Sequence, residues 1–123
     1  NVHVIEGDFL EITLKRKFHI VTFNKVLEHI EEPKEMILKA KSFIKNESFI
    51  YAEVPHINAA NFGKNREEFF IEHLHVFSEK SLKILANDCG FNCLEIDILE
   101  EPSGKYTMRA VLNAKKKCLK NLN

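Results

Sequence analysis

The sequence has few cysteines, and none of them are paired at the spacing of metal ligands. Its three cysteines are Cys89, Cys93 and Cys118, with no CxxC motif. An odd number without such a pair argues against a disulfide framework and a zinc site, and it favours a reducing, cytoplasmic location. No apolar run reaches the roughly 18 to 20 residues of a membrane span, and no signal peptide is recognisable. We therefore expect no membrane association.

The chain also lacks an excess of either charge. Its 18 Lys and Arg residues balance 18 Asp and Glu residues, so the formal net charge is zero. Without a long-range field, neither nucleic acid nor an acidic membrane surface is an expected partner. A small group of lysines near the C-terminus is more simply a solvated end. This group is Lys115, Lys116, Lys117 and Lys120.

No glycine-rich turn between a strand and a helix is found in the sequence, which has four glycines. What the chain does contain is typical of a folded domain. Of its 123 residues, 45% are hydrophobic and 29% are charged. This length and composition predict one α/β domain over 1–123 with a real apolar core.

Apolar patterns predict an alternation of strands and helices. One helix is expected to begin at Pro33 and to end at Asn46 in a left-handed cap. Another should follow the N-cap Ser78 and end at Gly90. Residues 65–75 also look helical. The predicted strands are 2–5, 18–23, 48–55, 92–99 and 106–114. The strand at 18–23 should be buried on both faces. The strand at 92–99 should place Leu94, Ile96 and Ile98 on one face, and it should form a hairpin with 106–114 through a loop at 100–105.

A polar turn follows the predicted strand at 18–23. It carries Asn24, Lys25, Glu28 and His29. In open α/β sheets, ligands bind outside the carboxyl ends of the strands, so these side chains mark a candidate site. His56 follows the next predicted strand and should face the same crevice.

Three segments together resemble the C-terminal part of class I S-adenosylmethionine-dependent methyltransferases. They are IEGDF at 5–9, VLEHI at 26–30 and HLHVFS at 73–78. The resemblance implies a Rossmann-like, three-layer α/β fold, truncated at the N-terminus, with a mostly parallel sheet and a C-terminal antiparallel hairpin. It also implies methyl transfer to a small-molecule acceptor, as in natural-product or glycan pathways.

The resemblance implies roles for particular residues. Asp8 would accept a hydrogen bond from the adenine of the cofactor and Phe9 would pack on its ring, although Asp8 alone fits a simple turn. Asn24, Lys25 and His29 would complete the cofactor-binding set. The catalytic candidates are His29 and His73, and the candidates for acceptor binding are His56, His73 and His75.

Some alternatives remain open at this stage. His29 could instead cap the neighbouring helix, and Glu28 could be a structural partner in the turn. His73 and His75 should point to opposite sides of an extended segment, and no third ligand stands at a recognisable spacing, so no metal site is expected.

The missing glycine-rich loop would hold much of the cofactor. We therefore expect this chain to be a fragment that binds S-adenosylmethionine weakly or not at all by itself. The exposed flank of the strand at 18–23 could mediate homodimer formation. One alternative is a non-catalytic methyltransferase remnant that acts as a binding or dimerisation module. Another is a different Rossmann-like enzyme, such as a nucleotide-sugar enzyme or a dehydrogenase.

Overall fold

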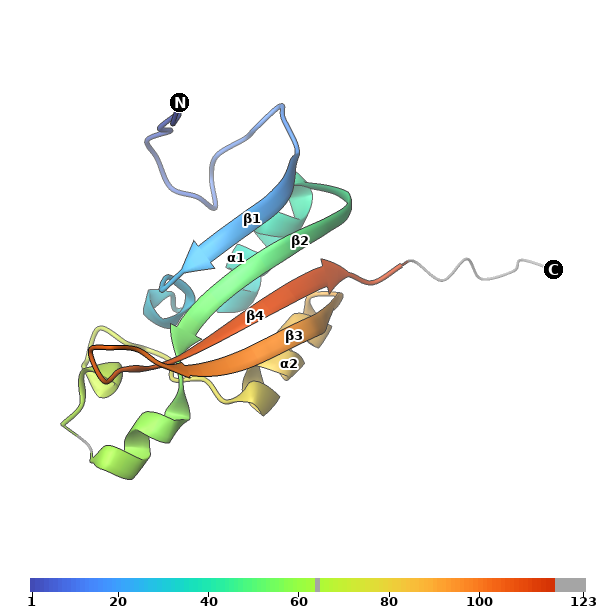
Figure 1. Ribbon diagram of the computed structural model, residues 1–123. Coiled ribbons are helices and arrows are strands. Elements are labelled where there is room, and N and C mark those ends of the chain that lie inside the picture. The colour runs from blue at the N-terminus through green and yellow to red at the C-terminus, as the bar shows by residue number, and fades with distance from the viewer. Residues whose placement is uncertain (64, 117–123) are drawn as a thin grey trace.

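A four-stranded mixed sheet forms the centre of the protein (Figure 1). The computed structural model describes residues 1–63 and 65–116, so Lys117, Cys118 and Lys120 lie outside the described residues. The strand order is β1-β2-β4-β3, in which β1 and β2 are parallel and β4 is antiparallel to both of its neighbours. The strands are β1 (Phe18–Asn24), β2 (Ile44–Pro55), β3 (Phe91–Glu100) and β4 (Tyr106–Ala114).

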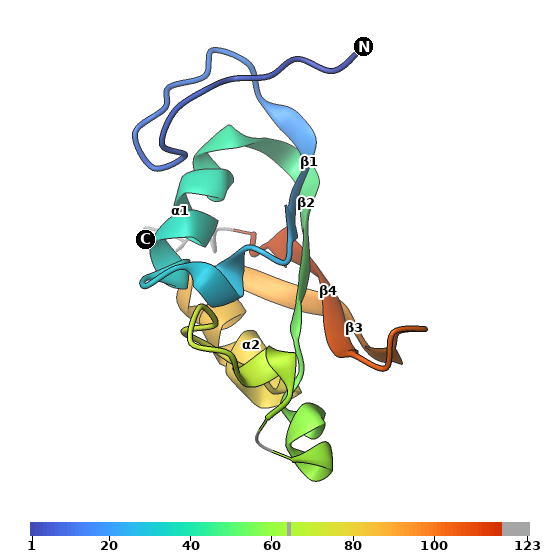
Figure 2. The ribbon, with the colours of Figure 1, turned by 90° about the vertical axis from the view of Figure 1, so that its left-hand side faces the viewer.

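Two α-helices cover the same face of this sheet (Figure 2). They are α1 (Pro33–Phe43) and α2 (Glu79–Asp88), and three short 3-10 helices lie between the main elements: η1 (Leu27–His29), η2 (Ile57–Phe62) and η3 (Glu67–Phe69). Within the described ranges, neither α-helix is long and apolar enough to cross a membrane.

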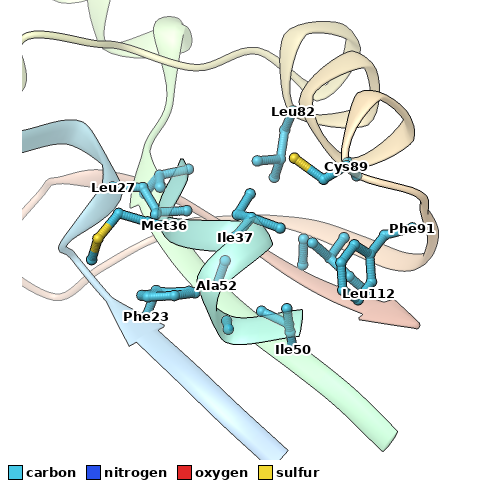
Figure 3. Packing of buried hydrophobic residues seen from close by; sticks show 14 of the residues in the cluster. Phe23, Leu27, Met36, Ile37, Ile50, Ala52, Leu82, Cys89, Phe91 and Leu112 are labelled. Atoms are coloured by element: carbon cyan, nitrogen blue, oxygen red, sulfur yellow. The ribbon is translucent and has the colours of Figure 1, made fainter. Parts of the chain in front are cut away.

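The hydrophobic core fills the space between the helices and the sheet (Figure 3). Ile37 of α1 and Leu82 of α2 are fully buried against Ile50 and Leu112 of the sheet. Burying side chains of this size stabilises a fold by about 1.5–3 kcal/mol each. The opposite face of the sheet is open, and it exposes Ile20 by 58% and Phe49 by 40%.

Several predicted elements are confirmed. Pro33 begins α1, and Ser78 caps α2 through a reciprocal pair of bonds in which each hydroxyl of Ser78 and Ser81 accepts from the other's backbone N–H. The C-terminal hairpin of β3 and β4 is also present. Its loop is closed by a hydrogen bond from the Glu101 N–H to the Lys105 carbonyl, 2.8 Å.

Two predicted elements are wrong. Residues 2–5 form no strand, because they pair with no other strand in the described part of the chain. Residues 65–75 form no α-helix beyond the single turn of η3. There, the N–H groups of Leu74 and His75 both donate to the Glu28 carbonyl, at 2.8 and 3.2 Å, instead of to their own segment.

Three local expectations also need correction. α1 ends at Phe43 and β2 begins at the next residue, so Asn46 is not its left-handed cap. β1 is not buried on both faces, because α1 and α2 cover only one of them. An irregularity in the pairing of β3 between Cys93 and Glu95 breaks the alternation. Leu94 therefore leaves the predicted common face and is 50% exposed, whereas Ile96 and Ile98 do share one face and lie opposite the buried Ala110 and Met108 of β4.

Candidate functional site

A cavity of about 300 Å³ lies at the carboxyl ends of β1 and β2. Its lining comes from four places in the sequence: the turn after β1, the end of β2, the loop between η2 and α2, and the start of β4 with the residue before it. Because β4 is antiparallel to β2, its first residues meet the end of β2 at this edge. The lining residues include Lys25, Glu28, His29, Pro55, Glu68, His73, Lys105, Tyr106 and Thr107.

Lys25 lies where the chain leaves β1. Its backbone has a φ of 55°, a left-handed conformation that costs free energy for a residue with a Cβ. The Lys25 N–H donates to the Glu53 carbonyl at 2.9 Å, and its Nζ donates to Glu101 Oε1 at 2.7 Å. These contacts hold the left-handed turn and direct the chain into η1.

The η1 turn places Glu28 and His29 at the cavity wall. Glu28 is buried, with only 1% of its surface exposed, and burial raises the pKa of its carboxyl group above the ordinary value. Its Oε2 atom has no hydrogen-bond partner within the described part of the chain. A buried oxygen without a partner is costly, so Glu28 is more than a simple turn residue.

His29 and His73 are 44 residues apart in the sequence but adjacent in the cavity wall. Their ring centroids are 4.7 Å apart in an edge-to-face arrangement. His29 Nδ1 is 2.9 Å from the Glu72 carbonyl, and His73 Nδ1 is 3.0 Å from the Glu68 carbonyl. A carbonyl oxygen only accepts, so both Nδ1 atoms carry the proton, and each neutral ring has its lone pair on Nε2.

The other two predicted acceptor-binding histidines do not line the cavity. His56 is 1% exposed; its Nδ1 accepts from the Asn58 N–H at 3.1 Å, and its Nε2 therefore donates to Glu79 Oε1 at 3.1 Å. These bonds tie the end of β2 to the start of α2. His75 turns away, with its Nε2 3.2 Å from the Glu31 carbonyl.

The predicted cofactor-binding residues are only partly brought together. Lys25 and His29 line the cavity, whereas Asn24, exposed at the end of β1, is not among the lining residues. Asp8 and Phe9 are not among the lining residues. The Asp8 carboxylate accepts from the Leu10 N–H at 2.9 Å, and the Phe9 ring packs edge-on against Phe23 and Phe43. Of the five predicted cofactor-binding residues, Lys25 and His29 thus line the cavity, whereas Asp8 and Phe9 are engaged in local packing.

Four acidic residues line the cavity without a functional role predicted for them: Glu28, Glu67, Glu68 and Glu72. The last three lie in a segment without a clear periodic pattern, and no sequence signal marks them. Glu28 belongs to the polar turn that marks the candidate site, but the sequence suggested only a structural role for it.

The architecture described above is a Rossmann-like α/β fold with its site at the carboxyl ends of parallel strands. A family model described as "Methyltransferase domain" matches residues 3–96. The chain belongs to this methyltransferase family, which confirms the resemblance found in the sequence. No curated protein sequence matches the chain significantly.

Solved structures of methyltransferases share this fold. One of them is a 1,6-didemethyltoxoflavin-N1-methyltransferase from Burkholderia thailandensis, whose structure contains 1,6-didemethyltoxoflavin and S-adenosylhomocysteine. Its sequence is 11% identical to this chain. The TM-score is 0.72, and the match covers 91% of this chain and 50% of that one. An S-adenosylmethionine-dependent methyltransferase from Clostridium acetobutylicum is 11% identical, with a TM-score of 0.69 over 89% of this chain and 63% of that one.

A third similar structure is the magnesium protoporphyrin IX methyltransferase of Synechocystis, which contains S-adenosylhomocysteine. It is 17% identical, with a TM-score of 0.64 over 89% of this chain and 49% of that one. At such identities the likeness shows the fold alone, and it confirms the α/β, Rossmann-like prediction. The chain spans about half to two thirds of the length of these three proteins.

Proposed function

We propose that this chain forms the acceptor side of an S-adenosylmethionine-dependent methyltransferase for small molecules of the cytoplasm. One observation carries the proposal: His29 and His73, distant in the sequence, meet at the cavity at the carboxyl ends of β1 and β2. This is the edge at which open α/β sheets bind their ligands. The family to which the chain belongs supports the reaction type.

The residues at the strand end are those that would hold the cofactor. Asn24 and His29 would contact it, and Asp8 could do so only by giving up its bond to the Leu10 N–H. The bound cofactor would supply a methyl group on a sulfonium, whose transfer requires alignment of the acceptor. His56 is committed to Glu79 and Asn58, so we do not retain it as a contact for the acceptor.

The two cavity histidines are suited to take a proton from the acceptor. Each has a lone pair on Nε2, because its Nδ1–H donates to a backbone carbonyl. An acceptor hydroxyl or amine that hydrogen-bonds to Nε2 would lose its proton there as the new bond to carbon forms. The carbonyls of Glu68 and Glu72 would stabilise the resulting imidazolium through the same Nδ1–H bonds.

The experiment is a titration of the isotope-labelled full chain with S-adenosylhomocysteine, followed by amide NMR shifts. We expect weak, millimolar-range binding, with shifts concentrated at residues 24–29 and at His73. His29→Ala should reduce these shifts and His75→Asn should leave them unchanged. Shifts of equal size in the wild type and in His29→Ala would contradict a cofactor contact at His29. Micromolar binding would contradict the expectation that this chain holds the cofactor only weakly.

A further inference from the structure

Within the described part of the chain, no lysine or arginine forms an ion pair with the buried carboxylate of Glu28, and its ion-pair contact is with His29 Nε2 at 3.8 Å. The Glu28 Oε2 atom has no hydrogen-bond partner among residues 1–63 and 65–116, although only 1% of the residue is exposed to solvent. The nearest lysine in the sequence, Lys25, pairs with Glu101 at 2.7 Å instead. Isolating an ionised carboxylate from water costs several kcal/mol, so a cation or a proton must accompany it.

Two imidazoles face this carboxylate. The Nδ1–H groups of His29 and His73 are both used by backbone carbonyls, which leaves the Nε2 lone pairs available. A hydrogen bond from one ring nitrogen to a carbonyl is the arrangement that orients metal-binding histidines and fixes their tautomer. His29 in the turn after β1 and His73 in the loop before α2 each have such a hydrogen bond from Nδ1 to a backbone carbonyl.

The three side chains are close enough to share one ion. One ligand atom from each lies within 4.8 Å of the others, and Glu28 Oε1 is 3.8 Å from His29 Nε2. Around a first-row metal ion, with bonds of about 2.0–2.2 Å, neighbouring ligand atoms lie roughly 3 Å apart. Small rotations of the two rings would bring the ligand atoms from within 4.8 Å to this spacing, and the side chain of His29 is 41% exposed and so has room to turn.

We propose that Glu28, His29 and His73 form a binding site for a divalent transition-metal ion of the Zn²⁺ type. Two imidazoles and one carboxylate suit Zn²⁺, Co²⁺ or Fe²⁺, whereas Mg²⁺ and Ca²⁺ prefer oxygen ligands alone. Three protein ligands leave at least one coordination position open. All three residues line the cavity, so this position is available to water or to an oxygen or nitrogen atom of a bound small molecule. The sequence predicted no metal site, so this proposal departs from that expectation. Because each ring offers only Nε2, a histidine that binds the ion cannot at the same time take a proton from the acceptor, and the two roles exclude each other.

The third ligand escaped sequence reasoning for a geometric reason. His73 and His75 are separated, as expected for alternate positions of an extended segment, and only His73 faces the cavity. The remaining ligands come from η1, 44 residues earlier. The two hydrogen bonds from residues 74 and 75 to the Glu28 carbonyl hold these segments together.

The test is a titration of the tag-free, metal-free full chain with Co²⁺, followed by its visible absorption bands and then by displacement with Zn²⁺. We expect one Co²⁺ per chain and a rise in melting temperature with Zn²⁺. Glu28→Gln and His73→Ala should each weaken binding at least about tenfold. His75→Ala is the matched control, and it should leave the affinity unchanged.

A second measurement keeps the variants informative. Glu28→Gln removes a buried charge, so without metal this variant should melt at the same or a higher temperature than the wild type, while losing the stabilisation by Zn²⁺. The proposal is overturned if the folded wild-type chain shows no Co²⁺ bands at millimolar metal. It is equally overturned if Glu28→Gln binds as tightly as wild type, or if His75→Ala weakens binding as much as His73→Ala. None of these readouts depends on methyl transfer.

Discussion

The guanidinium of Arg66 donates two hydrogen bonds to the carboxylate of Glu68, from Nε to Oε2 at 3.1 Å and from Nη2 to Oε1 at 2.7 Å. The same pair reaches the C-terminal hairpin: Arg66 donates to the Gly104 carbonyl at 2.6 Å, and the Tyr106 N–H donates to Glu68 Oε1 at 3.1 Å. The outer wall of the cavity is therefore attached to the hairpin by partly buried, charge-assisted hydrogen bonds, which are stronger than neutral ones.

Glu68→Gln should destabilise the protein. The amide would present an NH₂ group in place of one carboxylate oxygen, so one of the bonds to Arg66 would be lost within a buried network. We expect the free energy of unfolding to fall by about 2–3 kcal/mol. Urea denaturation at neutral pH, followed by circular dichroism, measures this change.

The neighbouring Glu67→Gln is the control for that substitution. Glu67 pairs with Lys105, but both side chains are more than 40% exposed. An exposed pair of this kind contributes less than about 1 kcal/mol. Equal losses for the two glutamine variants would contradict a special role of Glu68.

The carboxylate of Glu68 should make the free energy of unfolding depend on pH in the acidic range. Its hydrogen bonds with Arg66 lower the pKa of Glu68 from 4.5 to about 2. Because the pKa is lower in the folded state, the stabilisation is complete above pH 4.5 and is lost as the pH falls from 4.5 to about 2. Its size is on the order of 3 kcal/mol. Urea midpoints measured across this range should fall less steeply for Glu68→Gln than for wild type, and parallel curves would contradict the prediction.

Glu47→Gly should stabilise the chain. Glu47 is exposed near the start of β2 and has a φ of 58°, in the left-handed region. The left-handed conformation costs a residue with a Cβ about 1–2 kcal/mol, and the entropy of glycine in the unfolded chain offsets part of the gain. A net increase of about 0.5–1 kcal/mol in the free energy of unfolding is expected.

Glu47→Ala separates this backbone effect from the loss of charge. Alanine removes the carboxylate but keeps the Cβ, so its unfolding free energy should stay within about 0.5 kcal/mol of wild type. If alanine and glycine stabilised the chain equally, backbone strain would not be the cause. Thermal and urea denaturation of the three proteins decide this.

The flank of β1 should mediate self-association. In the described part of the chain, β1 is an edge strand, and its exposed Ile20 lies next to Phe49 of β2 on the open face. Unpaired edges with apolar side chains favour pairing between copies, and a lysine there opposes it. We expect Ile20→Lys to weaken association at least about tenfold in sedimentation velocity.

An exposed isoleucine on the helical face provides the comparison. Ile84 of α2 is 52% exposed, so Ile84→Lys introduces the same charge away from β1. Its association should equal that of the wild type. A wild-type chain that stays monomeric at high concentration, or equal effects of both lysines, would refute the edge contact.

Local signals account for the elements that the sequence predicted correctly. Pro33 begins α1 because its ring fixes φ near the helical value. Ser78 caps α2 because its hydroxyl accepts a hydrogen bond from the N–H of Ser81, three residues later. The strand at Tyr106–Ala114 has the predicted bounds. The errors fall where partners are remote. In the 65–75 segment, the N–H groups of Leu74 and His75 donate to the distant Glu28 carbonyl instead of forming helical hydrogen bonds. Residues 2–5 have no strand to pair with in the described part of the chain.

The sequence by itself determined the family, the α/β class and the edge of the sheet at which the cavity lies, because strand patterns and the segments around Glu28 and His73 are local properties of the chain. Only the tertiary structure decided which histidines share that site. His29 and His73 face the cavity, while His56 and His75 are bound to Glu79 and to the Glu31 carbonyl. Side-chain direction in irregular segments depends on hydrogen bonds between distant loops, and no sequence period encodes those bonds.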